Sequence, residues 1–444
     1  MTRRVWLTAL ALLIVAPPGV KGQELVTLDQ AVATALAQNA ALRASRSTSA
    51  EAATHITEAR SGYFPRVSFV ESWQRGDQPV FVFSSLLSAR RFTAANFAID
   101  ALNYPAPTGF FHATLGVEQL LFDGGRQRAA VAGASLQRDI AATTTDQAAA
   151  TLALATTEAF GRIMAADAAY HAAEAALASG QEDLARATRR RDAGMATDAD
   201  VLGLVVHVAD LQQRGIQARG DSAIACAELN RLMGTAIDRE FRVVEPAIAD
   251  SVVGNTPNVA ALLAEADAAR PELQRAAAAE QLAAAGRRQA RAAFVPQVAA
   301  QAVVDVGGTQ FTDRQSSWLV GGELRWTFST GGAEVAQMKA ATEAGARARA
   351  EREDVRAAVQ VEVVSALRRL ESARARQAAG RAAANQARES QRIVRDRFDA
   401  GLASVNDVLQ ASTAVLDADS HRTSALVDVL VSDAMLRRAL GRTR

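Results

Sequence analysis

The sequence repeats itself over most of its length, and this repeat limits what the chain can fold into. The eleven residues from Asp192 to Leu202 share seven identities with those from Asp399 to Leu409, at a spacing of 207 residues. Upstream, Phe64–Val67 aligns with Val295–Val298 at a spacing of 231, so the first copy carries 24 extra residues before Phe122. Chance similarity between alanine-rich helices would not keep consistent spacings at several separated positions. We therefore predict two copies of one structural unit.

Each copy contains one very long segment that lacks proline and is rich in helix-forming residues. The segments run from Gly125 to Asp192 and from Gly332 to Asp399, 68 residues each. At 1.5 Å per residue, such a helix would be roughly 100 Å long. It cannot bury itself in a compact domain and must pack along partner helices as a coiled coil, where abundant alanine permits close approach. A tight turn and a return helix follow each segment, and a shorter helix precedes the strands, roughly Leu28 to Gly62 and Asn258 to Ala293.

Between the first helix and the long helix of each copy, apolar and polar residues alternate with period two. Val67, Phe69 and Trp73 alternate with polar residues in the first copy, and Trp318 and Val320 belong to such a pattern in the second. Alternation over about ten residues is the pattern of a transmembrane barrel strand, although a half-buried soluble sheet would show it too. We predict two strands per copy and four per chain.

The N-terminus has the composition of a secretory signal peptide. Two arginines precede an apolar run from Trp6 to Ala16, and two prolines end this run. The small residue Gly22 follows, where a signal peptidase would cleave. The run is too short to span a bilayer, although a signal anchor is an alternative. No other apolar stretch approaches eighteen residues, so a membrane-embedded chain must use a β-barrel. The predicted organisation is a signal peptide at 1–22, a first structural repeat at 23–250 and a second at 251–444.

Four strands cannot close a membrane barrel, because the smallest single-chain barrels have about eight. An open sheet would leave unpaired edges in lipid, which is not viable. Several chains must therefore share one barrel. Three chains supply twelve strands, which enclose a lumen that side chains do not fill.

The turn after each long helix carries a repeated local pattern. Copy two has Arg397, Phe398, Gly401, Asp407, Val408, Leu409 and Ala411, and copy one has Arg190, Gly194, Asp200, Val201 and Leu202. With the repeat, the strands and the long helices, this pattern resembles the TolC family of outer-membrane efflux proteins over essentially the whole mature chain. Copy one departs from the pattern at Arg191, where the family has an aromatic residue, and at Leu204, where it has alanine.

The resemblance implies a mixed α and β membrane protein. Its parts would be a trimeric twelve-stranded outer-membrane β-barrel, with four strands per chain, and a long periplasmic α-helical coiled-coil barrel that continues it. Residues from Gln23 to about Gln38 and from Ile237 to Pro257 would contribute to an equatorial region around the helices. The expected function is the passive exit duct of a tripartite efflux or type I secretion system. Substrates would arrive from an inner-membrane pump through a periplasmic adaptor protein.

The tips of the two helical hairpins are the first candidate site. Gly194 and Gly401 lie where the chain reverses, and such a turn requires a positive φ that glycine tolerates. Thr197 and Ser404 follow where an N-cap oxygen would begin the return helix. This structural role is sufficient in itself, and the resemblance adds docking onto the α-hairpins of the adaptor. The docking residues expected are Gly194, Met195, Ala196, Thr197, Gly401, Leu402, Ala403 and Ser404.

The periplasmic entrance is the second candidate site. In a trimer, Asp200 and Asp407 would form a ring of up to six carboxylates that favours cations. The alternative is that each acid complements the dipole at a helix N-terminus. Arg190 and Arg397 are the expected partners of the aspartates, with solvated surface as the alternative. Gln410 completes the candidate gate, at a position that is acidic in some relatives.

Composition argues against other classes of function. A formal net charge of +1 gives no support for nucleic-acid binding, which needs a basic patch. One cysteine and five scattered histidines suggest no metal site, and no catalytic motif is present, so we expect no enzyme activity and no cofactor. The remaining alternative is a periplasmic coiled-coil structural protein. The insertion at about 76–109, which is rich in aromatic residues, would lie on the extracellular side as a lid or plug.

Overall fold

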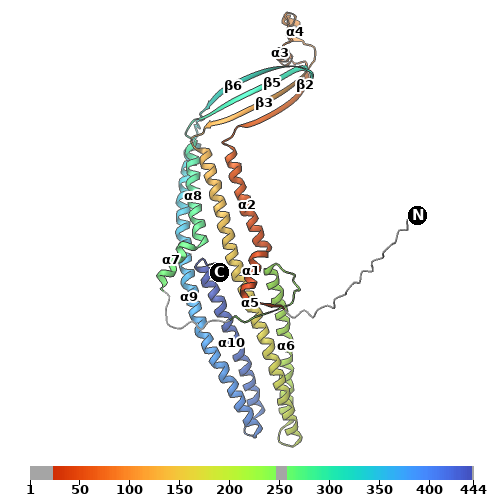
Figure 1. The fold of residues 1–444 in the computed structure, drawn as a ribbon, viewed down its shortest axis with the longest axis vertical. Helices are drawn as coiled ribbons and strands as arrows, with labels where there is room; N and C mark the ends of the chain where they lie inside the picture. Colours follow the sequence, from red (N-terminus) through yellow and green to blue (C-terminus); the bar gives the residue numbers. More distant parts are fainter. Residues whose placement is uncertain (1–23, 247–257, 443–444) are drawn as a thin grey trace, which may run out of the picture. The chain divides into compact units, whose positions relative to one another are not determined.

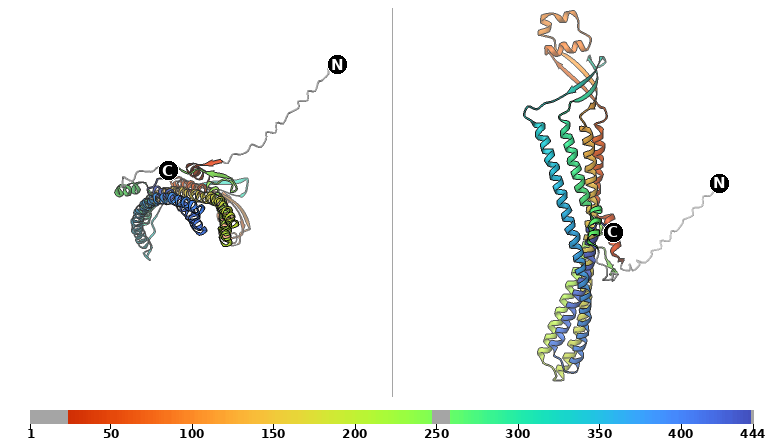
Figure 2. Two further views of the ribbon diagram at one scale, coloured as in Figure 1. Left: turned by 90° about the horizontal axis from the view of Figure 1, so that it is seen from below. Right: turned by 90° about the vertical axis from the view of Figure 1, so that its left-hand side faces the viewer.

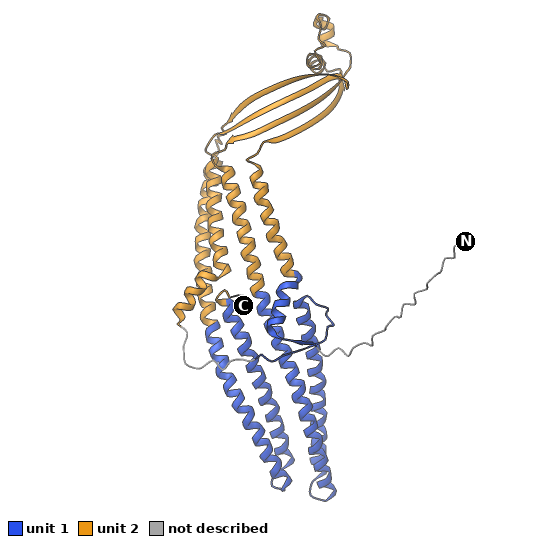
Figure 3. Cartoon of the chain, viewed as in Figure 1, with its two compact units in different colours: residues 1–40, 151–256, 366–438 blue, residues 41–150, 257–365, 439–444 orange. Residues whose placement is uncertain are grey.

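The computed structural model describes residues 24–246 and 258–442, so the predicted signal peptide and the predicted repeat boundary at residue 250 lie outside the described residues. The chain divides into two compact units (Figure 3). The first unit comprises residues 1–40, 151–256 and 366–438, and the second comprises residues 41–150, 257–365 and 439–444. Each unit therefore draws on both sequence repeats, and the assignment of the repeats as separate domains remains a prediction.

Four strands form one antiparallel sheet in the second unit (Figure 1). They are β2 (Arg66–Gly76), β3 (Thr108–Phe122), β5 (Gln297–Gln310) and β6 (Asp313–Arg325). Their order across the sheet follows their order in the chain, so β2 and β6 are the edges. Two strands come from each repeat, which confirms the predicted number of four.

The register of the strands gives the sheet one apolar and one polar face. Leu115 of β3 pairs with Phe69 of β2 and with Val304 of β5. The large side chains of this apolar face are Val67, Phe69, Trp73, Phe111, Leu115, Val304, Trp318, Val320 and Leu324. On the polar face, Asp305 accepts a 2.7 Å hydrogen bond from the Thr114 hydroxyl and lies 3.0 Å from Nε2 of His112. Period-two alternation thus predicted the two faces correctly, because strand side chains alternate between faces.

The two long helices occupy nearly the segments predicted for them. They are α5 (Arg126–Asp192) and α9 (Ala333–Asp399), 67 residues each, and their return helices are α6 (Asp198–Met233) and α10 (Val405–Ala439). Gly125 and Gly332, immediately before the long helices, have φ of 89° and 69°. These positive angles explain why the helices begin one residue later than the sequence suggested. Within residues 24–246 and 258–442, no helix is long and apolar enough to cross a membrane.

The helix that precedes the strands is broken in both copies, which corrects the prediction of continuous helices. The first copy has α1 (Leu28–Gln38) and α2 (Ala40–Ser61), and the second has α7 (Val259–Ala269) and α8 (Pro271–Ala292). Asn39 is extended (φ −61°, ψ 128°), and its side chain donates a 2.9 Å hydrogen bond to the carbonyl of Leu232. Arg270 is also extended, because a following proline excludes the helical conformation.

The core of the first unit surrounds the upper part of the hairpin α5–α6. Phe160, Ile163, Leu229 and Met233 are fully buried there. The short parallel pair β1 (Glu24–Val26) and β4 (Phe241–Val243) covers them through Val26 and Phe241. These strands lie in the two segments expected to contribute to an equatorial region. The remaining described elements form the insertion between β2 and β3: α3 (Pro79–Ser88), η1 (Ala94–Phe97) and α4 (Ile99–Asn103).

Candidate functional site

The two hairpin tips have the same backbone geometry, and both tips belong to the first unit (Figure 3). Gly194 and Gly401 have φ of 75° and 79°. At the first tip, the N–H of Met195 donates to the carbonyl of Arg190 at 2.8 Å, and at the second the N–H of Leu402 donates to Arg397 at 2.8 Å. A left-handed glycine followed by such a bond is the usual C-terminal cap of a helix. The predicted role of both glycines is confirmed.

Each return helix begins with a reciprocal cap. Thr197 accepts a 3.2 Å hydrogen bond from the N–H of Asp200, whose carboxylate accepts a 2.9 Å bond from the N–H of Thr197. Ser404 and Asp407 repeat the arrangement at 3.2 and 2.8 Å. Thr197 and Ser404 are therefore N-caps, as predicted. Hydrogen bonds from the Thr197 N–H and hydroxyl lower the pKa of Asp200, and those from Ser404 lower the pKa of Asp407.

Apolar side chains project from the rigid turns. Met195 is 65% exposed and Leu402 is 71% exposed, while Ala196 and Ala403 are half-buried beside them. The tips thus present a fixed backbone with one large apolar side chain each.

Within the described protomer Arg190 contacts Phe398, and pairing of Arg190 and Arg397 with the aspartates stays a prediction. The guanidinium of Arg190 lies 4.7 Å from the centre of the Phe398 ring and also donates to the Phe398 carbonyl. Arg397 is exposed and lowers the pKa of Asp407 only through its charge, after the larger effect of the Ser404 hydrogen bonds. Gln410 is exposed as well. The ring and the carbonyl of Phe398 together hold the guanidinium of Arg190 at the end of α9.

A small apolar core joins the two hairpins just inside the tips. Phe398, Val405 and Val408 of the second hairpin pack against Ala187 and Leu204 of the first. Leu204 is only 1% exposed. This residue departs from the repeat pattern, because alanine stands at the matching position of copy two. Its larger side chain fills the space beside Phe398, so the departure is part of the packing between the hairpins.

A buried charge cluster lies farther from the tips and was not found from the sequence. Asp183 of α5 is 3% exposed and lies 2.8 Å from Arg186 and 3.3 Å from Arg395 of α9. Arg395 also donates to the hydroxyl of Ser179. The buried residues Ala173, Gly180 and Ala187 recur every seven residues along this side of α5. An acid between them in the sequence was the one signal that could have predicted a buried charge here.

His207 of α6 extends this polar region toward α10. Its Nε2 lies 3.4 Å from the hydroxyl of Ser412, which is buried. Burial lowers the pKa of His207, and the negative charge of Asp210 opposes that effect. The ring therefore stays neutral down to a lower pH than an exposed histidine would, and it packs as an uncharged group between the hairpins.

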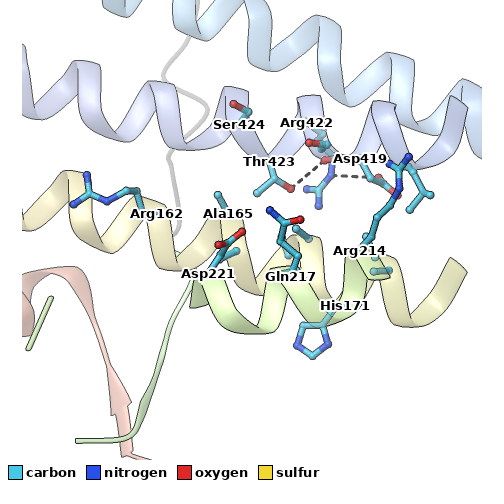
Figure 4. Close-up of a pocket in the computed structure, with 18 of the residues that line it drawn as sticks. Arg162, Ala165, His171, Arg214, Gln217, Asp221, Asp419, Arg422, Thr423 and Ser424 are labelled. Carbon is cyan, nitrogen blue, oxygen red and sulfur yellow. Dashed lines mark hydrogen bonds and ion pairs between the residues drawn. The ribbon is translucent and has the colours of Figure 1, made fainter. Parts of the chain in front are cut away.

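A groove of about 930 Å³ runs between the hairpin α5–α6 and α10 (Figure 4). Its floor is rich in alanine, including Ala165, Ala169 and Ala218. Charged side chains border the floor: Arg162 is 2.7 Å from Glu228, and Arg388 is 2.5 Å from Asp419. Small side chains let a helix approach closely, so the groove has the form of a helix-binding surface. No site was predicted at this groove from the sequence.

Comparison with known proteins gives the same fold and one family. The sequence matches the family of outer membrane efflux proteins over residues 31–235 and 262–442. No curated protein matches it in sequence.

Several solved structures are similar to the chain. The structure of CusC is 16% identical, covers 94% of this chain and 92% of its own, and gives a TM-score of 0.79. VceC from Vibrio cholerae is 18% identical, with 94% and 96% covered and a TM-score of 0.76. The CmeC channel of Campylobacter jejuni is 15% identical, with 93% and 85% covered and a TM-score of 0.78. At these identities the likeness shows the fold.

Proposed function

Because the chain belongs to the outer membrane efflux protein family, we propose that three copies form one continuous exit duct, which serves an inner-membrane pump through a periplasmic adaptor. Members of this family are channels of the outer membrane and not enzymes. The observation that carries the proposal is the four-stranded sheet, which has one apolar face and two free edges within the described chain. Such a sheet suits a barrel wall that several chains share.

The strand directions support closure by three copies. β2 and β6 are antiparallel within the sheet, because three antiparallel pairings separate them. The β6 edge of one protomer can therefore pair antiparallel with the β2 edge of the next. Three copies give twelve strands around an open lumen. The apolar face would contact lipid, and the charged residues Glu71 and Arg314 on that face are neutralised by a 2.8 Å ion pair.

We assign the hairpin tips to docking of the adaptor. Met195 and Leu402 are the exposed apolar anchors, and Gly194, Ala196, Thr197, Gly401, Ala403 and Ser404 set the backbone that presents them. The partner would be an α-helical hairpin, since the alanine-floored groove beside α10 offers a helix-sized surface above the same tips. A rigid tip loses little entropy on binding, which favours specific contact.

The entrance would combine two elements. In a trimer, Asp200 and Asp407 give six carboxylates whose lowered pKa keeps them charged, so that cations are favoured. Contact between Arg190 and Phe398 would hold the two hairpins of each protomer together and keep the entrance narrow. Arg397 and Gln410 are exposed and free to face a neighbouring protomer.

The mass of the particle extracted from outer membranes in detergent tests this proposal. We expect three protomers per particle. A matched pair of variants tests the faces of the sheet: Trp318→Arg places a charge toward lipid at a cost of about 2–4 kcal/mol, whereas Ser317→Arg places it toward the lumen. Trp318→Arg should lower the yield of trimer, and Ser317→Arg should not. A soluble monomer in the periplasm would overturn the duct and favour a coiled-coil structural protein.

A further inference from the structure

The insertion between β2 and β3 is a folded module of the second unit. It begins after Gly76 and ends at Thr108, which are paired across the two strands. Phe92 lies at its centre, with ring centroids 4.6 Å from Phe83 and 5.0 Å from Phe97, both edge to face. Such contacts hold α3 to η1 through the ring of Phe92. Figure 2 shows the module at the end of the strands that lies away from the helices of the same unit.

The module packs against the polar face of the sheet. Gly76 lies on that face by register, and a Cβ built on it would be 3.8 Å from the ring of Phe81 at the start of α3. Phe110, on the same face, is 8% exposed. Its ring occupies the space above Gly307, where a Cβ would come within 2.5 Å of Cζ. α3 contacts β5 here. The buried residues of α3 are Val82 and Ser85, and the buried C-cap residue Ala89 follows them at helical spacing.

Two arginines fix the module to the end of the β5–β6 hairpin. Arg91 lies 2.5 Å from Asp313 and donates a 2.8 Å hydrogen bond to the hydroxyl of Thr309. Arg90 donates to the carbonyl of Ser316 at 3.2 Å. Arg90 has φ of 54°, in the left-handed region that costs a non-glycine residue about 1 kcal/mol or more. The hydrogen bond from the Arg90 side chain to the Ser316 carbonyl thus helps to hold the strained backbone of Arg90 in place.

We propose that the module is a lid over the outer mouth of the lumen, and that the Arg91–Asp313 ion pair is its latch. The inference rests on the shared barrel proposed above, in which the apolar face contacts lipid and the polar face lines the lumen. A module on the polar face then lies inside the outer mouth and not on the lipid side. It obstructs the exit from three positions around the axis.

Cysteine accessibility on intact cells tests the barrel and the lid separately. Ser68 and Val67 are neighbours on β2 that face opposite sides of the sheet. Each is replaced by cysteine in a Cys226→Ala background, and a membrane-impermeant maleimide is added outside. Ser68→Cys should react and Val67→Cys should not. Equal reaction at both positions would overturn the barrel orientation and, with it, the lid.

Opening the lid should then accelerate the reaction at Ser68→Cys. Asp313→Asn removes the acid of a half-exposed ion pair, so the labelling rate should rise about two- to fivefold. Asp100→Asn is the matched control, since Asp100 is an exposed acid of α4 that is not part of the Arg91–Asp313 latch, and it should leave the rate unchanged. Replacing residues 77–107 by Asn-Gly keeps the pairing of Gly76 with Thr108 and should raise the rate further. If Ser68→Cys reacts at one rate in all these chains while Val67→Cys stays protected, the lid is wrong and the barrel stands.

Discussion

The guanidinium of Arg190 lies over the ring of Phe398, 4.7 Å from its centre, and donates to the carbonyl of the same residue. One residue thus joins the end of α5 to the end of α9. The equivalent contact with the roles of the two copies exchanged, from Arg397 to the copy-one position that matches Phe398, cannot form. Arg191 stands at the position that corresponds to Phe398, and it forms a 2.7 Å ion pair with Asp192. We call the contact between Arg190 and Phe398 the clamp. In a trimer, the clamp would exist inside each protomer. It would be missing between protomers, where Arg397 of one would meet Arg191 of the next.

Loss of the clamp should loosen the entrance. Arg190→Gln removes a cation–π contact worth about 1 kcal/mol, and Phe398→Ala removes a buried ring at a cost of about 3 kcal/mol. Both should raise the single-channel conductance of trimers in planar bilayers. The control is Arg397→Gln, which removes an exposed arginine at the matching position of copy two. If Arg397→Gln opens the channel as much as Arg190→Gln, the clamp does not hold the entrance.

The helix caps predict a dependence of stability on pH. The folded pKa of Asp407 lies below its unfolded value, so its contribution to stability is present above about pH 4 and is lost as the pH falls through the folded pKa. Thermal melting of wild type and Asp407→Asn should therefore differ by a constant amount from pH 5 to 8 and converge in stronger acid. Ser404→Ala should lower stability by about 1 kcal/mol. A difference that grows in acid would contradict the cap.

The buried acid in the hairpin pair should be important for stability. Asp183→Ala leaves Arg186 and Arg395 without their shared carboxylate, and breaking a buried pair costs about 3 kcal/mol when the arginines remain partly solvated. Glu182→Ala is the control. Its carboxylate is exposed and lies 4.0 Å from Arg186, a long distance for an ion pair. Loss of this weak interaction should change stability by less than about 0.5 kcal/mol. Similar melting temperatures for the two variants would exclude a structural role for Asp183.

The sequence predicts most where a local signal repeats. The glycines before α5 and α9 and the capping residues at the tips are local features, so the helices and turns could be placed closely. The break at Arg270 could also have been read from Pro271, but Asn39 is extended because its side chain reaches the distant carbonyl of Leu232. The contact between Arg190 and Phe398 joins residues far apart in the chain, and periodicity carries no information about such a pair. The burial of Asp183 likewise depends on a residue far away in the chain, Arg395.

Gly234 provides a test of the packing between α6 and the first helix. It ends α6 with φ of 71°, and a Cβ there would lie 2.5 Å from the carbonyl oxygen of Gln38. Gly234→Ala therefore combines a left-handed alanine with a collision against backbone that cannot rotate away, and it should cost at least about 1–2 kcal/mol. Gly286→Ala is the opposite case: Gly286 lies inside α8 with open space around its Cβ position, so alanine should stabilise by up to about 1 kcal/mol. Thermal unfolding of the two variants should shift in opposite directions from the wild type. A lower melting temperature for Gly286→Ala would mean that another chain packs against α8 at this point.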